Sequence, residues 1–226
     1  MRTMTTNPDL RRRICFGVLA ILSLGLLSIV DNNAYTFARA HAPALEWIGR
    51  YRVTSLATCL GLYLSTGPAR SYQFPVRNAQ WRVVALIAGF WFIPDLLMLY
   101  VARVPVPVLR STPDLTAFLL TGLLAEELLF RGAIYQLAER TLPCTFVSVG
   151  VRLPLWPIVA SALFFSLAHL QYYGFAITVP ALAQLSYTLI MGLMWGPLRF
   201  LTSSIWPAIA FHLITNAIAL PRIIGG

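Results

Sequence analysis

The sequence predicts an all-α fold: a polytopic membrane bundle of about seven transmembrane helices, within a range of six to eight. Hydrophobic residues make up 58% of the 226 residues and charged residues only 11%. A soluble domain usually carries about 25% charged residues. The apolar residues also gather in long runs, so we expect them to face lipid in an integral, multi-pass membrane protein.

The basic residues are all arginines, and the net charge of the chain is +9. Such a balance sometimes indicates nucleic-acid binding, but here the arginines flank the apolar runs, where they set topology and contact anionic head groups. We therefore expect the lipid bilayer, and no nucleic acid, as a partner. The distribution of arginines between alternate loops favours a cytoplasmic N-terminus. All-arginine usage in a short chain suggests a prokaryotic plasma membrane.

The N-terminal region carries a basic cluster, Arg11-Arg12-Arg13, followed by an apolar run over residues 14–30. A signal peptide has a shorter apolar run and a prompt cleavage site with small residues. We therefore predict an uncleaved first span. Residues 34–52 mix aromatic and charged residues, which is typical of an amphipathic helix at the membrane surface, although a crossing segment remains an alternative.

Six further apolar runs predict the remaining spans: residues 53–65, 83–102, 115–138, 155–173, 179–195 and 205–220. Gly174 is expected to end the fifth helix, and residues 196–204 are expected to form a short loop before the last one. Asp95 interrupts the third run beside Pro94, and we interpret it as a helix-break or boundary residue. The cysteines Cys15, Cys59 and Cys144 have no metal-binding or disulfide spacing.

Two adjacent carboxylates and an arginine stand inside the fourth apolar run, at Glu126, Glu127 and Arg131. Each such charge costs roughly 2.5–3.5 kcal/mol at the centre of a membrane helix, so a compensating reason is needed. Glu127 and Arg131 are four residues apart, so they share a helix face and can pair. Glu126 points away from that face. Our hypothesis is that Glu126 is the reacting carboxylate and that the Glu127–Arg131 pair holds it.

Other polar residues fall in the last two thirds of the bundle: His169 in the fifth run, and His212 and Asn216 on one face of the seventh. Taken singly, His169 is better explained as a core histidine bonded to a neighbouring helix, and His212 with Asn216 is explained as well by a hydrogen bond between helices as by a function. Taken together with Glu126, they form a set that could activate water and stabilise an oxyanion. Glu126, His169 and His212 could instead bind a divalent metal such as zinc. We expect no cofactor, because a glutamate and two histidines need no ion to activate water.

These residues stand in three motifs that resemble those of the CAAX-protease and bacteriocin-processing family (CPBP or Abi), which includes the Rce-type prenyl-protein endopeptidases. The motifs are Glu126-Glu127-x-x-x-Arg131, Phe165-x-x-x-His169 and His212-x-x-x-Asn216. The resemblance covers roughly residues 113–216. It divides the chain into residues 1–110, helices without a family motif, and residues 111–226, a catalytic helical core.

The resemblance implies an intramembrane endopeptidase of the glutamic type, although many such proteins are described as metalloproteases. Glu126 would activate water with help from His169. His212 and Asn216 would form the oxyanion hole, and the remaining two motif residues, Glu127 and Arg131, would support the site. The sequence lacks the motifs of the zinc, presenilin-type and rhomboid-type intramembrane proteases.

The expected substrate is a membrane-associated peptide or protein, cut near a C-terminal tail. Two other functions remain open from the residues. One is a non-catalytic immunity or scaffold protein whose polar cluster binds a partner. The other is a proton-coupled transporter that uses Glu126 and His169 as a relay, although the chain shows no repeat between its halves of the kind many transporters have.

Overall fold

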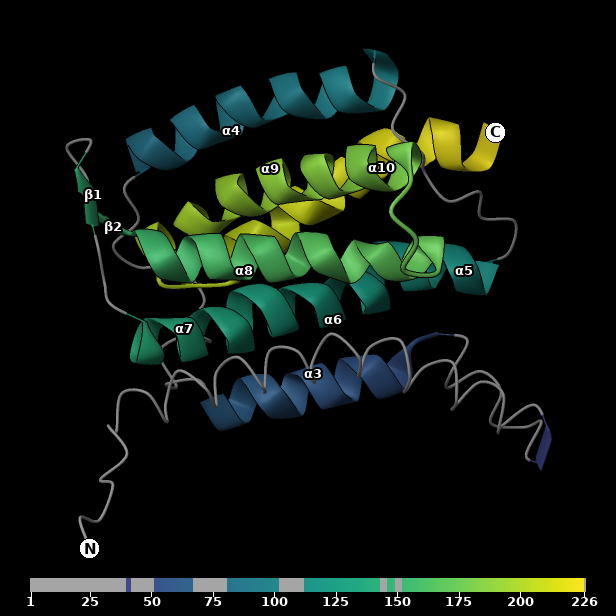
Figure 1. Cartoon of the computed structure of the whole chain (residues 1–226), viewed down its shortest axis with the longest axis horizontal. Coiled ribbons are helices and arrows are strands. Elements are labelled where there is room, and N and C mark those ends of the chain that lie inside the picture. The colour runs from purple at the N-terminus through teal and green to yellow at the C-terminus, as the bar shows by residue number, and fades with distance from the viewer. Residues whose placement is uncertain are drawn as a thin grey trace, which may run out of the picture.

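A computed structural model describes residues 40–41, 51–66, 81–101, 112–142, 146–148 and 152–225. The predicted first span, at residues 14–30, and most of the predicted surface helix at residues 34–52 lie outside these ranges. The described chain is almost entirely helical, and its long helices lie side by side (Figure 1). This arrangement confirms the all-α membrane bundle.

The two N-terminal described helices are α3, Val53–Thr66, and α4, Trp81–Leu96. α4 continues directly into a π-helical turn, η3, Leu97–Val101. Pro94 therefore lies within a continuous helical run and does not end it. Figure 1 shows that these helices occupy opposite sides of the bundle, with the helices of the C-terminal half between them.

The helical run that carries Glu126 and Glu127 alternates between α-helical and π-helical segments. Its parts are α5 (Thr112–Thr116), η4 (Ala117–Thr121), α6 (Gly122–Glu127), η5 (Leu128–Ile134) and α7 (Tyr135–Thr141). η4 and η5 are π-helical. π-helical turns are rare and are frequently found at functional sites. The predicted span at residues 115–138 is therefore confirmed as helical, with an irregular turn on either side of the glutamates.

Residues after α7 form a short antiparallel pair, β1 (Phe146–Ser148) and β2 (Arg152–Pro154), in which Val147 pairs with Leu153. α8, Leu155–Ala168, follows and tightens into a 3₁₀ turn, η6, His169–Tyr173. Gly174 then adopts a left-handed conformation with φ of 58°, which a glycine accepts without steric cost. The predicted helix end at Gly174 is confirmed.

α9, Val179–Thr202, begins where the Thr178 hydroxyl accepts a hydrogen bond from the Ala181 backbone N–H. The prediction of a loop at residues 196–204 is wrong, because α9 continues through Pro197 to Thr202. Gly196 permits this continuation by packing directly against Ile158. Arg199 is buried in the same helix and lies over the Tyr135 ring, 5.5 Å from its centroid.

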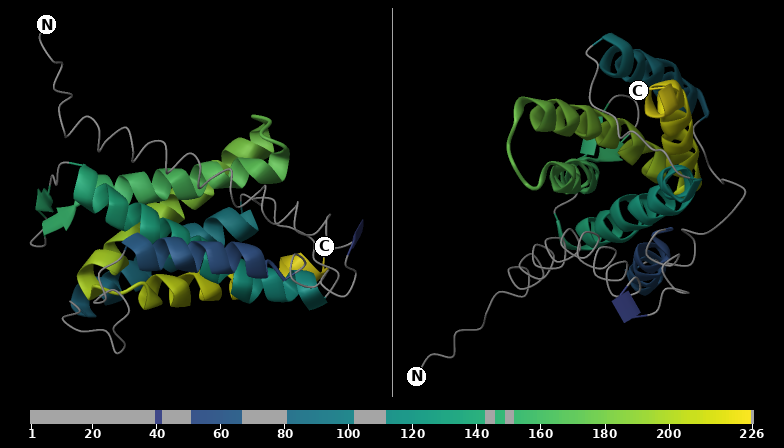
Figure 2. Two further views of the ribbon diagram at one scale, coloured as in Figure 1. Left: turned by 90° about the horizontal axis from the view of Figure 1, so that it is seen from below. Right: turned by 90° about the vertical axis from the view of Figure 1, so that its right-hand side faces the viewer.

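The last helix, α10, spans Trp206–Gly225 and extends past the predicted end at residue 220. α8 and α9 approach closely where Gly192 faces Ala162: a Cβ atom on Gly192 would lie 2.8 Å from the Ala162 Cα. Gly192 and Gly196 thus form a small-x-x-x-small contact of the type that lets membrane helices pack tightly. Figure 2 shows these helices grouped together when the bundle is viewed from below and from one end.

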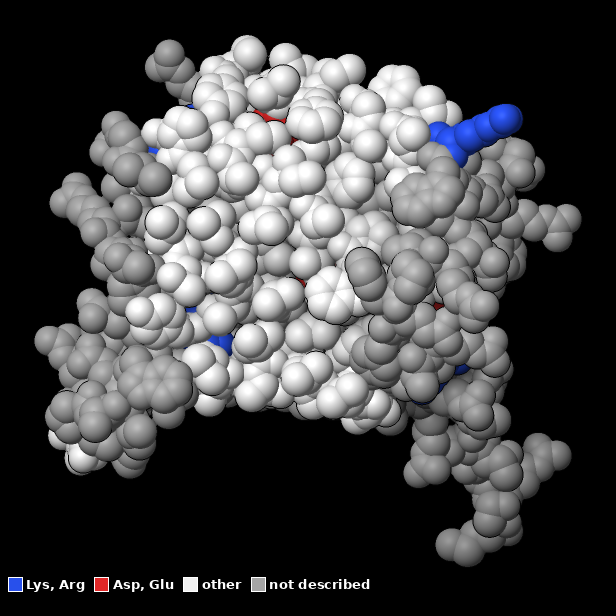
Figure 3. Space-filling view, turned by 180° about the vertical axis from the view of Figure 1, so that it is seen from behind, with Lys and Arg blue, Asp and Glu red and all other residues white. Residues whose placement is uncertain are grey.

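Three helical segments among the described residues are long and apolar enough to cross a membrane: Val84–Val101, Leu155–Tyr173 and Val179–Thr202. Val53–Ser65 is a shorter apolar helix. Outward-facing side chains such as Phe90, Ile93 and Leu163 are exposed. Figure 3 shows that the described surface on one face is almost entirely uncharged. These features are those of an integral membrane protein.

Candidate active site

The centre of the bundle contains a buried ion pair between Glu127 and Arg131. Arg131 Nη1 donates to Glu127 Oε1 over 2.9 Å, and both side chains are 0% exposed. The pair confirms the expected geometry of residues four apart on one helix. His212 reaches the same oxygen from α10, with its Nδ1 atom 2.8 Å from Glu127 Oε1. We expected the Glu127–Arg131 pair to hold Glu126. Among the described residues, the side chain that hydrogen-bonds to Glu127 from outside the pair is instead His212.

Glu126 lies on the other side of the His212 ring. Its Oε2 atom is 3.9 Å from His212 Nε2, and the Glu126 side chain is 16% exposed. Glu127 is fully buried, so of the adjacent glutamates Glu126 is the more accessible to water or substrate. His212 therefore stands between both carboxylates, with one ring nitrogen directed at each.

His169 is oriented by its own helix. Its Nδ1 atom lies 2.8 Å from the Phe165 carbonyl oxygen. A carbonyl oxygen only accepts, so Nδ1 must carry a proton and Nε2 is left for other partners. His169 also interacts electrostatically with Glu126, His212 and Arg131. The structure therefore brings His169 into the same cluster as the acidic pair.

Aromatic rings enclose the charged groups. The Arg131 guanidinium carbon lies 3.9 Å from the centroid of the Phe165 ring, an arrangement in which a cation is attracted to the ring face. His169 and His212 each meet Phe165 edge-on, at centroid distances of 4.9 and 5.8 Å. Trp195 covers the other side of His212 at 4.7 Å. Phe165 therefore contacts all three basic side chains, which explains its place in the second motif.

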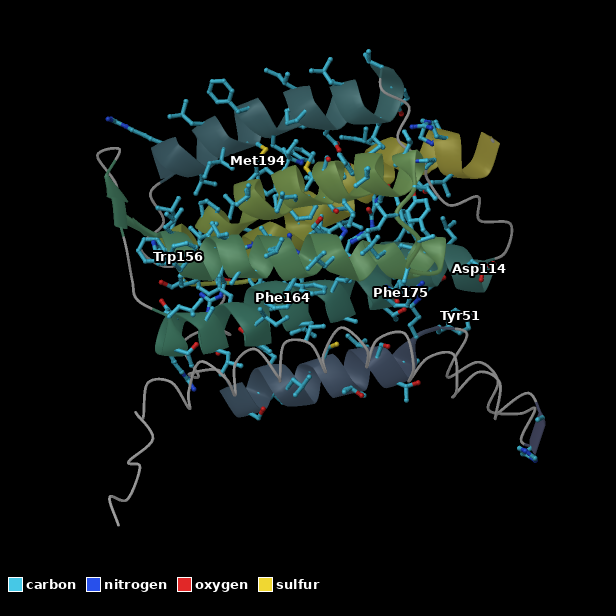
Figure 4. All side chains as sticks on the ribbon, in the orientation of Figure 1. Tyr51, Asp114, Trp156, Phe164, Phe175 and Met194 are labelled. Atoms are coloured by element: carbon cyan, nitrogen blue, oxygen red, sulfur yellow. The ribbon has the colours of Figure 1, made fainter. Side chains whose placement is uncertain are left out.

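Trp195 was not identified from the sequence. The available signal was a tryptophan between two glycines, Gly192 and Gly196. Figure 4 shows the side chains of this region crowded between α8, α9 and α10, with Phe164 and Met194 midway between Trp156 at one end of the bundle and Phe175 at the other.

Asn216 lies one turn beyond His212 on α10 and is buried. Its Nδ2 atom donates to the Phe118 carbonyl oxygen over 3.1 Å. This hydrogen bond ties α10 to η4, the π-helical turn before the glutamates. A side-chain amide has two N–H groups, so the second remains for another acceptor.

Asp95 was expected to be a boundary residue, and that expectation is wrong. It is 0% exposed, and its Oδ1 atom accepts a hydrogen bond from Tyr187 Oη over 2.5 Å. Asp95 also interacts electrostatically with His212. Pro94 beside it does not end the helix, because α4 continues into η3 and turns Asp95 inward. A third carboxylate therefore lies in the bundle interior near the site.

The metal candidates Glu126, His169 and His212 do not form a ligand set in the described part of the chain, where no group of three or more His, Cys, Asp or Glu side chains is arranged to hold a metal ion. One nitrogen of each histidine already bonds to a protein oxygen. The expectation that water activation needs no metal ion stays a prediction.

Comparison with known proteins identifies one family. Residues 108–218 match the model described as Rce1-like, type II CAAX prenyl endopeptidase. No curated protein and no solved structure matches the chain. The matched residues contain all three motifs. The match supports a protease function in general and implies a membrane-bound peptide substrate. Over residues 108–218, this chain is therefore similar to the Rce1-like CAAX protease family.

Proposed function

We propose that the protein is an intramembrane endopeptidase that uses Glu126 and His169 to activate water against a peptide bond in a membrane-associated tail. The observation that carries this proposal is the convergence of Glu126, Glu127 and His212 at 2.8–3.9 Å inside an apolar bundle. Ionisable groups are expensive at this depth and are retained where they have a function.

The first step is proton removal from water. Glu126 is the more exposed glutamate, so its carboxylate is the group that a water molecule can reach. Glu126 takes a proton as the water oxygen attacks the peptide carbonyl carbon. The unengaged Nε2 of His169 assists by orienting this water, because Nδ1 is already bonded to the Phe165 carbonyl.

The second step is stabilisation of the oxyanion on the former carbonyl oxygen. The second N–H of Asn216 supplies one donor. His212 Nε2 supplies another when it carries a proton, while Nδ1 remains bonded to Glu127. Collapse of the intermediate breaks the C–N bond, and the proton held by Glu126 moves to the departing amine. Glu127 and Arg131 keep the His212 ring in place throughout.

A cleavage assay with the purified protein in liposomes tests this function. The substrates are a fluorogenic peptide library with and without a lipid on the C-terminal segment. The wild-type protein should cleave members of the library, and Glu126→Gln and His169→Ala should abolish cleavage while inserting and purifying normally. Glu139→Gln is a matched control, because Glu139 is exposed on α7 of the same helical run. Retained cleavage in Glu126→Gln would refute the proposal.

A further inference from the structure

Asp95 is a buried carboxylate that the proposed mechanism does not use. It comes from α4, outside the segment that matches the family model. A carboxylate in the interior of a membrane bundle marks a functional site or a polar contact between helices. Its Oδ1 atom is satisfied by Tyr187 of α9. Its Oδ2 atom is buried and has no hydrogen-bond partner among the described residues.

The helical run α4–η3 lies along α10 in parallel, and four contacts fix their register. Trp91 meets Phe211 edge-on at 5.2 Å, and Leu99 shares a buried cluster with Ala219. The residue numbers differ by 120 at both of these points, since 211 − 91 and 219 − 99 are both 120, and by 118 and 123 at the two hydrogen bonds that follow. Two hydrogen bonds hold the far end: Tyr100 Oη to the Ile218 carbonyl over 2.6 Å, and Arg222 Nη1 to the Leu99 carbonyl.

The same register places Asp95 level with Thr215, midway between the two contact points. Thr215 is buried, and its Oγ1 atom has no hydrogen-bond partner in the part of the chain that the structure describes. A threonine in a helix commonly donates to the carbonyl one turn back, but Thr215 does not. The unpaired Asp95 Oδ2 atom and the unpaired Thr215 hydroxyl therefore lie at the same height along two neighbouring helices, α4 and α10.

We propose that Asp95 is a positioning residue for the active site. It ties α4 to α9 through Tyr187, and α4 to α10 through one buried water between its Oδ2 atom and Thr215 Oγ1. The turn of α10 that it fixes is the one that presents His212 and Asn216. This inference rests on the proposed function for its consequence, but the link itself is a structural claim that can be tested without any substrate.

Replacing either Asp95 or Thr215 alone leaves the other side chain without its partner. A buried polar group left without a partner is destabilising, whereas replacing both partners by apolar groups is often nearly neutral. Asp95 and Thr215 should therefore be coupled: replacing both should harm the protein less than the sum of the single replacements. Residues that are not in contact add independently.

Cysteine cross-linking tests the link directly. Cys15, Cys59 and Cys144 are first replaced by serine or alanine. The pair Asp95→Cys and Thr215→Cys should then cross-link with a short thiol reagent. A matched pair, Asp95→Cys with Leu213→Cys, should not, because Leu213 is exposed on another face of α10. Equal cross-linking of both pairs, or none in the first, overturns the proposed juxtaposition whether or not the protein proves to be a protease.

A mutant cycle tests the positioning role. Asp95→Asn keeps an acceptor for Tyr187 and a polar partner for Thr215, so kcat should stay within about threefold of wild type. Thr215→Val should lower kcat by roughly tenfold with little change in KM. Asp95→Leu should cost less in the Thr215→Val background than in the wild type, because only the bond to Tyr187 is then left to lose. Ser166→Ala, on α8, is the control that should combine additively with either. Full additivity of Asp95→Leu and Thr215→Val, in kcat and in thermal unfolding, overturns the role.

Discussion

His212 Nδ1 and Arg131 Nη1 approach the same oxygen of Glu127, at 2.8 and 2.9 Å. This shared oxygen joins α10 to the helical run that carries both glutamates. It also determines which ring nitrogen of His212 faces Glu126, because Nδ1 is occupied. Glu127 thus fixes the geometry of a histidine from another helix, a role that its spacing to Arg131 did not reveal.

Arg131 should contribute strongly to stability. Removing one partner of a buried ion pair leaves an uncompensated charge, which costs about 3–5 kcal/mol. We expect Arg131→Met to lower the thermal unfolding temperature in detergent far more than Arg140→Met, whose side chain is exposed on α7. Adding Glu127→Gln to Arg131→Met should restore part of the loss. An Arg131→Met protein as stable as the Arg140→Met control would contradict this account.

His212 should matter more for catalysis than for packing. His212→Phe keeps a ring against Trp195 and Phe165 but removes both nitrogens. Loss of a single oxyanion donor lowers kcat by about 10²–10³-fold, and we expect at least this effect with KM little changed. The measurement is steady-state cleavage in liposomes. Leu213→Ala is the control, because Leu213 is the exposed neighbour on α10.

Asn216 has two separable tasks. One N–H bonds to the Phe118 carbonyl, and the mechanism assigns the other to the oxyanion. Asn216→Asp retains the size of the side chain but has no N–H donor when ionised, so kcat should fall by about 10²-fold or more. Asn216→Gln retains the amide on a longer stem and should recover part of the activity if the second N–H reaches substrate. Equal activity in Asn216→Asp and wild type would remove Asn216 from the oxyanion hole.

Much of the fold was predictable from local patterns. Apolar runs of helical length marked every helix among the described residues, and the left-handed Gly174 was expected from its position after a helix. The four-residue spacings of Glu127 with Arg131 and of His212 with Asn216 also predicted shared helix faces correctly. These features depend on residues close together in the sequence, so they can be predicted from the sequence alone.

The features that were missed depend on contacts between helices. Asp95 resembles a helix breaker beside Pro94, and only its contact with Tyr187 of α9 reveals it as a buried residue. Arg199 suggested a loop, because the Tyr135 ring that covers it lies on a different helix. The sequence alone could not show whether His212 bonds to Glu126 or to Glu127, because either of two adjacent residues can be the one that faces α10.

The close approach of α8 and α9 predicts that a change in helix packing at Gly192 also affects the site. Any side chain at Gly192 would meet the Ala162 backbone, where a Cβ atom would lie only 2.8 Å from Cα. Backbone cannot yield as a flexible side chain can, so Gly192→Val should separate the helices and shift Trp195 and His169, which lie on either side of the contact. We expect loss of cleavage and a clear drop in unfolding temperature.

Gly89→Val is the matched control for this packing test. Gly89 is also helical, on α4, but a Cβ atom there would have no neighbour within 4 Å. Gly89→Val should therefore insert, unfold and cleave nearly as the wild-type protein does, apart from a helix-propensity effect below about 1 kcal/mol. Tryptophan fluorescence adds a readout at the site itself, since Trp195 covers His212. If Gly192→Val matched Gly89→Val in unfolding and cleavage, α8 and α9 would not be held together by this contact.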